Sequence, residues 1–165
     1  MGVEVNSAEQ ALTETTTAVD KIEDFLEAAR YDDIDDLISL ASSGISLDSK
    51  DSQGRTALHM ASANGHLDIV QYLIQHGVDV NVSNVEQNTP LHWACLNEHI
   101  EVVKCLILAG ANVSVLNSQQ RTPVDEAVSN GKMNVLDAIN EAVAQNELGG
   151  ATISESVAEL MSSES

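Results

Sequence analysis

The residues best suited to chemistry are five histidines and two cysteines, the types that ligate zinc or take part in nucleophilic catalysis. Four of the histidines form two pairs with the same spacing, His59 with His92 and His66 with His99. A structural role that recurs in each unit of a repeat accounts for such spacing. No Cys-x-x-Cys or His-x-x-x-His pattern is present, so we predict no metal site, no cofactor and no enzymatic activity.

The other reactive groups also lack catalytic partners. Cys95 and Cys105 lie in apolar segments with helical spacing, and no activating base is suggested beside them. We therefore expect both to be small buried thiols. Because no secretory signal precedes them, we expect a reducing compartment, namely the cytoplasm, with the nucleus as a second location. The run of acids at 32–36 lacks the glycine and the terminal glutamate of a calcium loop.

The elements that must position these residues follow from an internal repeat. Three segments align without gaps: RTALHMASANGHLDIVQYLIQHGVDVN, NTPLHWACLNEHIEVVKCLILAGANVS and RTPVDEAVSNGKMNVLDAINEAV. Thr56, Thr89 and Thr122 mark the register, with a period of about 33 residues. Threonine is a good helix N-cap, and Pro90 and Pro123 follow at the first helical turn, where a missing N–H costs nothing. Each segment predicts two short helices that must stack on neighbours to bury their apolar faces.

The stretches TALH, TPLH, GH and GVDVN resemble the signatures of the ankyrin-repeat family. The resemblance covers residues 21–145 and implies an all-α solenoid of paired short helices joined by β-turn loops. It also implies that His59 and His92 hydrogen-bond to the backbone between neighbouring repeats. About four repeats are expected, of which the first and last are degenerate caps: 21–50, 51–83, 84–116 and 117–145.

The two ends of the chain lie outside this register. Residues 1–20 are rich in threonine, glutamate and alanine, and we predict a disordered acidic segment there. Residues 146–165 predict a flexible acidic tail with a short helix at 153–161. Two interpretations of that helix stay open: it docks on the repeats or on a partner, or it is a frayed tail with chance periodicity.

The charge balance narrows the class of partner. The chain carries 26 acidic and 7 basic residues, and its formal net charge is −19. This field repels phosphate backbones and anionic lipids, so we expect no direct nucleic-acid binding and no membrane binding. We expect a basic protein partner and a chain that is monomeric when free. The N-terminal contact is assigned to the acids Asp32, Asp33, Asp35 and Asp36.

The remaining contact surface is assigned by position. In ankyrin arrays, partners usually contact the loop tips and the inner helices. The resemblance therefore implies a contact surface centred on residues 84–97. Its residues are Arg55, Met60, Val85, Glu86, Asn88, Trp93, Leu96, Asn97 and Glu126. A tryptophan among acids can anchor a basic, partly apolar segment. The alternative is that Trp93 is simply core between repeats.

Three residues depart from the family pattern at turns. Glu98 stands where the other repeats have Gly65 and Gly131, so we expect it to adopt a left-handed turn at a cost of about 1 kcal/mol. Gln87 and Gln120 replace the turn glycine of the first loop. We expect these two substitutions to deny the hairpin tips their easiest geometry.

The segments TALHMASANGHLDIVQYLI, NTPLHWACLNEHIEVVK and DEAVSNGK resemble, within the ankyrin family, the small acidic Yar-type chaperones of fungi. That resemblance implies an escort for a basic ribosomal protein of the small subunit, acting in ribosome biogenesis. Acidic caps would then compete with RNA for lysine and arginine. The alternative function is a generic ankyrin adaptor or regulator of a signalling or transcription protein.

Overall fold

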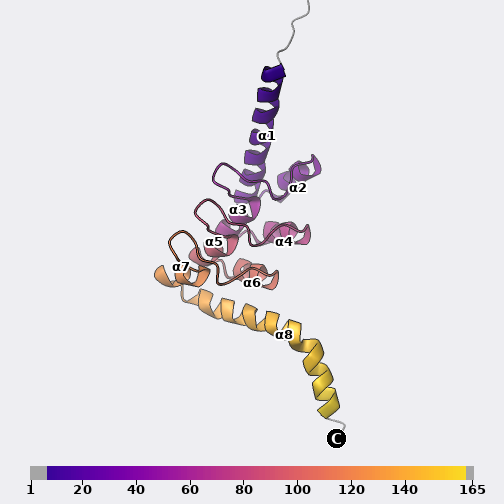
Figure 1. Ribbon diagram of the computed structural model, residues 1–165, viewed down its shortest axis with the longest axis vertical. Helices are drawn as coiled ribbons and strands as arrows, with labels where there is room; N and C mark the ends of the chain where they lie inside the picture. Colours follow the sequence, from indigo (N-terminus) through magenta and orange to yellow (C-terminus); the bar gives the residue numbers. More distant parts are fainter. Residues whose placement is uncertain (1–6, 163–165) are drawn as a thin grey trace, which may run out of the picture.

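A computed structural model describes the backbone of residues 7–162 and the side chains of residues 17–148 (Figure 1). Within that part the chain forms helices joined by turns and loops, with no strand. The helices are α1 (Ser7–Arg30), α2 (Ile34–Ser42), α3 (Ala57–Asn64), α4 (Leu67–Gln75), α5 (Pro90–Leu96), α6 (Ile100–Leu108), α7 (Pro123–Ser129) and α8 (Asn134–Ser162).

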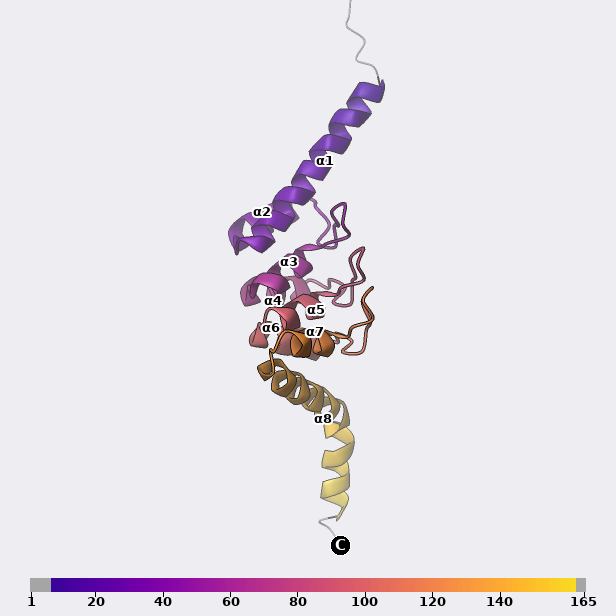
Figure 2. The same cartoon turned by 90° about the vertical axis from the view of Figure 1, so that its left-hand side faces the viewer.

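The helices stack as pairs. Helices α1, α3, α5 and α7 form one column, and α2, α4 and α6 form a second column beside it (Figure 1). The loops that precede α3, α5 and α7 project on the same side of the column (Figure 2). Helix α8 crosses the end of the stack and packs mainly on α6. The predicted all-α solenoid of paired helices is confirmed.

Threonine begins each inner helix of the register. The hydroxyls of Thr56, Thr89 and Thr122 accept hydrogen bonds from the third backbone N–H of α3, α5 and α7. In each case the side chain at that third position accepts a bond from the threonine N–H, which completes a capping box. Pro90 and Pro123 occupy the first helical turn. The predicted helix starts are confirmed.

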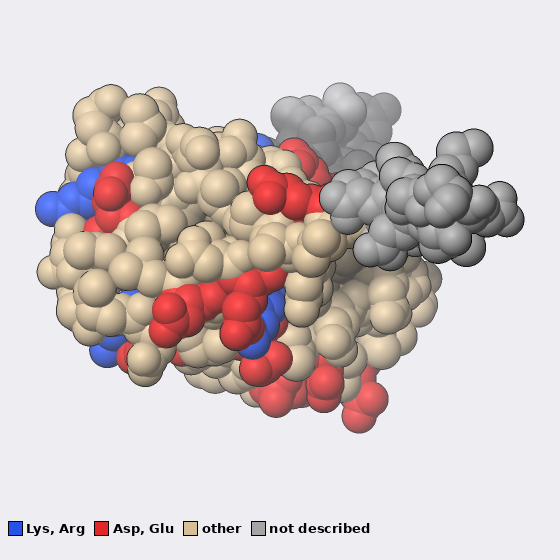
Figure 3. Space-filling model, turned by 90° about the horizontal axis from the view of Figure 1, so that it is seen from below, with Lys and Arg blue, Asp and Glu red and all other residues tan. Residues whose placement is uncertain are grey.

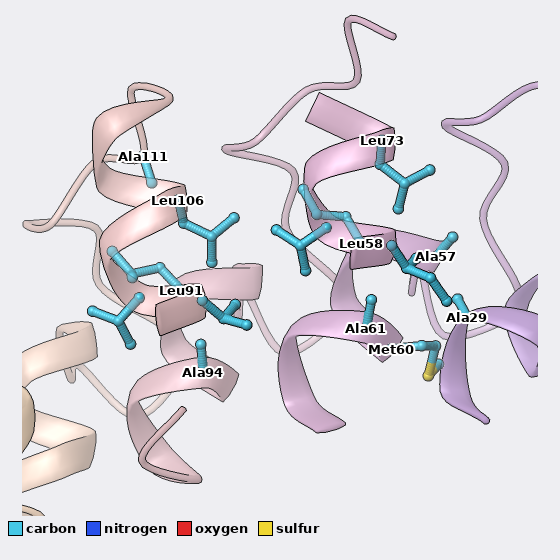
Figure 4. Close-up of a cluster of buried hydrophobic side chains, with 14 of the residues drawn as sticks. Ala29, Ala57, Leu58, Met60, Ala61, Leu73, Leu91, Ala94, Leu106 and Ala111 are labelled. Atoms are coloured by element: carbon cyan, nitrogen blue, oxygen red, sulfur yellow. The ribbon is translucent and has the colours of Figure 1, made fainter. Parts of the chain in front are cut away.

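Small side chains allow the inner helices to approach one another. Ala28, Ala61, Ala94 and Ala127 share one repeat position, and each is at most 4% exposed. Larger aliphatic side chains, such as the fully buried Leu91, fill the space between the columns (Figure 4). Burial of one such leucine contributes about 2 kcal/mol of transfer free energy.

Among the described residues, four other than glycine adopt the left-handed conformation. Gln87, Glu98 and Gln120 have φ between 59° and 63°, close to the φ of 72° at Gly54. The expected left-handed turn at Glu98 is confirmed. The two glutamines keep the glycine geometry rather than changing the loop. A cost of about 1 kcal/mol per residue is therefore built into these hairpins. Asp32 is the fourth, with φ of 61° at the turn before α2.

Both ends differ from the sequence prediction. The predicted disordered segment 1–20 is helical from Ser7, and residues 1–6 lie outside the described part. The predicted flexible tail 146–165 is helical to Ser162, and the helix predicted at 153–161 is part of α8. The reason is cooperative: an anchored helix adds one hydrogen bond per further residue, whereas an isolated short helix must first nucleate. Phe25 anchors α1 and Val135 anchors α8, both fully buried.

Candidate protein-binding surfaces

The histidines of the TALH and TPLH motifs join neighbouring repeats. His59 Nδ1 accepts the Thr56 N–H at 3.2 Å, and its Nε2 donates to the Asn88 carbonyl in the next repeat at 2.8 Å. His92 repeats the arrangement one unit later, with Nε2 2.9 Å from the Arg121 carbonyl. Burial lowers the pKa of His59 to about 4 and lowers the pKa of His92. These are neutral structural imidazoles, and the predicted inter-repeat bonds are confirmed.

The second histidine pair points back toward the preceding repeat. His66 Nε2 lies 2.7 Å from the Arg30 carbonyl, and His99 Nε2 lies 2.9 Å from the Ala63 carbonyl. The His99 ring lies so close to Gly65 that a Cβ there would be 2.5 Å from His99 Nδ1. Gly65, with φ of 74°, is therefore required by both its backbone and its neighbour.

The two cysteines are poorly suited to act as nucleophiles. Burial raises the pKa of the Cys95 thiol to about 12 and also raises the pKa of Cys105, which disfavours the thiolate. No three His, Cys, Asp or Glu side chains within the described range are grouped to hold a metal ion. None of the described helices is long and apolar enough to cross a bilayer.

An Asx residue holds each loop hairpin. Asn84 Oδ1 accepts backbone N–H groups of Glu86 at 3.0 Å and Asn88 at 2.9 Å. Asp51 and Asn117 do the same in the hairpins one repeat before and one repeat after. Backbone bonds link the hairpins in series, from Val85 N–H to the Gln53 carbonyl and from Ser118 N–H to the Glu86 carbonyl. None of these Asx residues was predicted, although an Asp or Asn at the same position of each repeat is a visible signal.

A hollow of about 210 Å³ opens between two hairpins and helices α5 and α7; we call it the Trp hollow. Its wall residues come from the middle and last repeats: Glu86, Asn88, His92, Trp93, Leu96, Asn117, Ser118, Gln119 and Glu126. Trp93 is half-buried, and its ring meets the His59 ring edge-on at 5.2 Å. One side of the indole is thus used in inter-repeat packing while the residue also lines the hollow.

The structure therefore brings five of the predicted contact residues to one place, namely Glu86, Asn88, Trp93, Leu96 and Glu126. Val85 is 68% exposed at the tip of the hairpin that contributes Glu86 and Asn88 to the hollow. Asn97 is exposed, but its side-chain amide is already used, donating to the Ala63 and Trp93 carbonyls. Arg55 lies in an earlier groove, where its guanidinium is 2.7 Å from the Asp51 carboxylate.

Met60 does not reach the contact surface, which corrects one predicted residue. It is only 3% exposed, and Arg30 donates to its sulfur at 3.5 Å. Met60, Trp93 and Glu126 occupy equivalent positions in successive repeats. Helix α1 covers that position in the first full repeat, so Met60 is not accessible to a partner. The equivalent residue of the next repeat, Trp93, is partly exposed.

A second hollow, of about 180 Å³, lies on the N-terminal cap; we call it the acidic hollow. Asp24 and Glu27 of α1 and Asp33 and Asp36 from the start of α2 surround it, together with Tyr31, which is 70% exposed. Two acid clusters that are separate in the sequence thus form one surface.

The other acids of this cap are also exposed. Asp32 and Asp35 are both exposed, and Asp32 Oδ1 lies 3.9 Å from His66 Nδ1. Asp33 has a structural task as well, because it caps α2 by accepting the Asp36 N–H at 3.0 Å. At the opposite end of the stack, acidic side chains lie in several separate groups on the face shown in Figure 3.

Comparisons with known proteins agree with this architecture. The family profile described as "Ankyrin repeats (3 copies)" matches residues 25–117 and 86–147. The liver isoform of mitochondrial glutaminase from Rattus norvegicus is 44% identical over 50 residues. That match covers 30% of this chain and only 8% of the rat protein, so the chain spans a small part of that relative. The profile covers most of the chain, which therefore belongs to the ankyrin-repeat family, a class of protein–protein interaction modules.

Proposed function

We propose that the chain is an acidic escort that binds a basic client protein, such as a ribosomal protein of the small subunit, and covers its RNA-binding surface. The observation that carries this proposal is the N-terminal cap. Residues 20–36 contain eight acidic and two basic residues, and all eight acids are exposed. Four of them surround the acidic hollow with the exposed ring of Tyr31. Carboxylates next to an aromatic ring form a surface that suits arginine and lysine side chains.

The physical mechanism is competition with RNA. A basic RNA-binding surface attracts phosphate and aggregates with other polyanions, and a carboxylate-rich protein occupies the same groups. Each exposed ion pair contributes only about 0.2–1 kcal/mol, so affinity must come from several pairs together. Such binding weakens as salt rises, because the Debye length is only about 10 Å at 0.1 M ionic strength. The client is then released where RNA competes for it, in the cytoplasm or the nucleus during ribosome assembly.

Affinity purification of the tagged full chain, at low and at moderate salt, tests the proposal. Mass spectrometry should identify proteins with basic RNA-binding surfaces, small-subunit ribosomal proteins among them, and moderate salt should release them. Recovery of one neutral signalling or transcription protein that resists salt would contradict the proposal. That outcome would support the generic adaptor instead.

Charge reversal locates the contact. Lysine replaces Asp24, Glu27, Asp35 and Asp36, while the helix cap Asp33 is kept. The control reverses Asp68, Glu101, Asp137 and Glu147, which are exposed on other helices, so both variants have the same net charge. The cap variant should lose client affinity on the order of tenfold or more, and the control should lose much less. Equal losses would assign the binding to overall charge rather than to the cap.

A further inference from the structure

The Trp hollow contains a buried carboxylate that the repeat itself does not fully satisfy. Glu126 is 8% exposed. Its Oε1 accepts from Asn117 Nδ2 at 2.8 Å. Its Oε2 is 3.7 Å from the nearest Arg121 nitrogen, which is beyond hydrogen-bond distance. Oε2 is not among the buried oxygen atoms without a partner, so water in the hollow reaches it. Oε2 therefore has room for a donor that approaches through the hollow.

The amide that holds Glu126 is fixed in place. Asn117 is 2% exposed, and its Oδ1 accepts two backbone bonds of the last hairpin, from Gln119 and Arg121. Its Nδ2 also donates to Asn88 Oδ1 at 2.9 Å. The carboxylate is thus held by a rigid scaffold rather than by a mobile surface chain. Such preorganisation lowers the entropy cost of receiving a cation.

Arg121 is a weak internal partner. In the first full repeat, Arg55 pairs with the carboxylate of Asp51 at 2.7 Å. The last repeat has Asn117 at the position of Asp51, so Arg121 has no hairpin carboxylate and its guanidinium extends toward Glu126. Its side chain is 44% exposed, whereas that of Arg55 is 29% exposed. A cation from outside can therefore displace Arg121 at little cost.

Size and chemistry select the ligand. A volume of about 210 Å³ is below the roughly 300–1,000 Å³ of small-molecule sites and fits one side chain. Trp93 and Leu96 supply apolar and aromatic wall, and the exposed Glu86 stands at the mouth. A guanidinium combines a planar fork for carboxylate with stacking on an aromatic ring, and it is less strongly hydrated than an ammonium.

The geometry points to the Trp hollow as a subsite for a single arginine side chain from an extended segment of the partner protein. Glu126 receives the guanidinium, Trp93 stacks against it, and Arg121 moves aside. This inference rests on the proposed function, since it assumes a basic partner. It adds a specific pocket and a preference for arginine over lysine.

Trp93 is the only tryptophan of the chain, so its fluorescence reports on the hollow directly. The full chain is titrated with a labelled peptide of four arginines separated by glycine and serine. Matched peptides carry lysine or citrulline, which is the neutral isostere of arginine. Peptide anisotropy measures binding anywhere on the protein, and Trp93 emission measures occupancy of the hollow. Both signals should follow the arginine peptide, with weaker binding for lysine and none for citrulline.

Variants separate the pocket from general charge. Glu126→Gln keeps the Asn117 bond and should weaken the arginine peptide roughly tenfold, whereas the exposed outer-helix control Glu101→Gln should change little. Arg121→Gln removes the competitor and should tighten binding more than Arg55→Gln, which makes the same change in net charge.

Each remaining outcome has a definite meaning. Anisotropy binding that is insensitive to Glu126→Gln, without a change in Trp93 emission, would overturn the subsite and leave the basic-client proposal standing. Weaker binding on Arg121→Gln would show that Arg121 itself contacts the partner, which also overturns the subsite. Absence of any preference for arginine over citrulline by anisotropy would overturn both proposals.

Discussion

Acidification should unfold the array through its buried histidines, with His59 as the largest contributor. The ordinary histidine pKa is 6.5, and burial lowers that of His59 to about 4. A depressed histidine pKa adds stability above the unfolded value, and this stability is lost as pH falls from 6.5 toward 4. From pH 7.5 to pH 5.0, linkage gives a loss of about 2 kcal/mol from His59 alone. His92, whose pKa is also lowered by burial, adds to the loss in the same direction.

Protonation of His59 is unfavourable because it would place two hydrogen-bond donors against each other. In the neutral ring Nδ1 accepts the Thr56 N–H, and Nε2 donates to the Asn88 carbonyl. Protonation places a hydrogen on Nδ1, which then faces the Thr56 N–H and can no longer accept it. The helix start of α3 therefore loses its capping box, and the buried ring carries an uncompensated charge.

Urea denaturation followed by far-ultraviolet circular dichroism, at pH 7.5 and pH 5.0, measures the effect. The wild type should lose about 2 kcal/mol more on acidification than the His59→Gln variant, whose side chain does not titrate in this range. Trp93 gives an independent check, because its ring lies 5.2 Å from that of His59. Native-state emission should titrate near pH 4 in the wild type. Equal pH dependence of the two proteins, together with an emission midpoint near 6.5, would refute the role of His59.

Three further predictions concern stability and use the same denaturation assay. Ser62 is fully buried and its hydroxyl has no hydrogen-bond partner, so Ser62→Ala should stabilise the protein by about 1 kcal/mol; a destabilised variant would reveal a hidden partner. Gly65→Ala should destabilise the protein by about 2 kcal/mol or more, because the new Cβ would clash with His99. Gly77 also has a left-handed backbone but has open space around it, so Gly77→Ala should cost only about 1 kcal/mol. Equal costs for the two variants would exclude the clash with His99. Gln120→Gly should stabilise the last hairpin by about 0.5–1 kcal/mol, and no gain would mean that its φ of 60° carries no strain.

The interior of the array was predictable because its signals are local. Thr89 caps α5, Pro90 follows it at the first turn, and His92 completes the capping box, all within one helical turn. The repeat spacing then places the same arrangement in each unit. Asp125 shows the same logic at the last repeat: its carboxylate still accepts the Thr122 N–H at 2.9 Å, which lowers its pKa. In the described part of the chain, α8 follows α7, and no further hairpin supplies a carbonyl for the second bond that a histidine would make.

The ends and the surface were less predictable because they depend on packing. The sequence before Lys21 is rich in threonine, alanine and glutamate, but it does not show that α1 continues back through these residues. Burial of Met60 depends on α1 lying across α3. The Trp hollow depends on the bond between Asn117 and Glu126, two residues whose separate repeat positions give no hint of the contact. Periodicity identifies equivalent positions, but exposure at each one is set by what lies next to it.

One repeat position connects the two candidate surfaces. Glu27, Met60, Trp93 and Glu126 succeed one another along the inner helices, one in each repeat. Glu27 lines both the acidic hollow and the groove beside the first hairpin, whereas Trp93 and Glu126 line the Trp hollow. Inner helices pack at about 8–10 Å, so α1 and α7, which are three packing steps apart, are separated by roughly 27 Å, which an extended segment spans with about eight residues. A basic segment that enters at Glu27 can therefore deliver an arginine to Glu126 while its flanking charges stay on the acidic cap. Under the two proposals, both surfaces would act on one ligand, and each would raise the effective concentration of that ligand at the other.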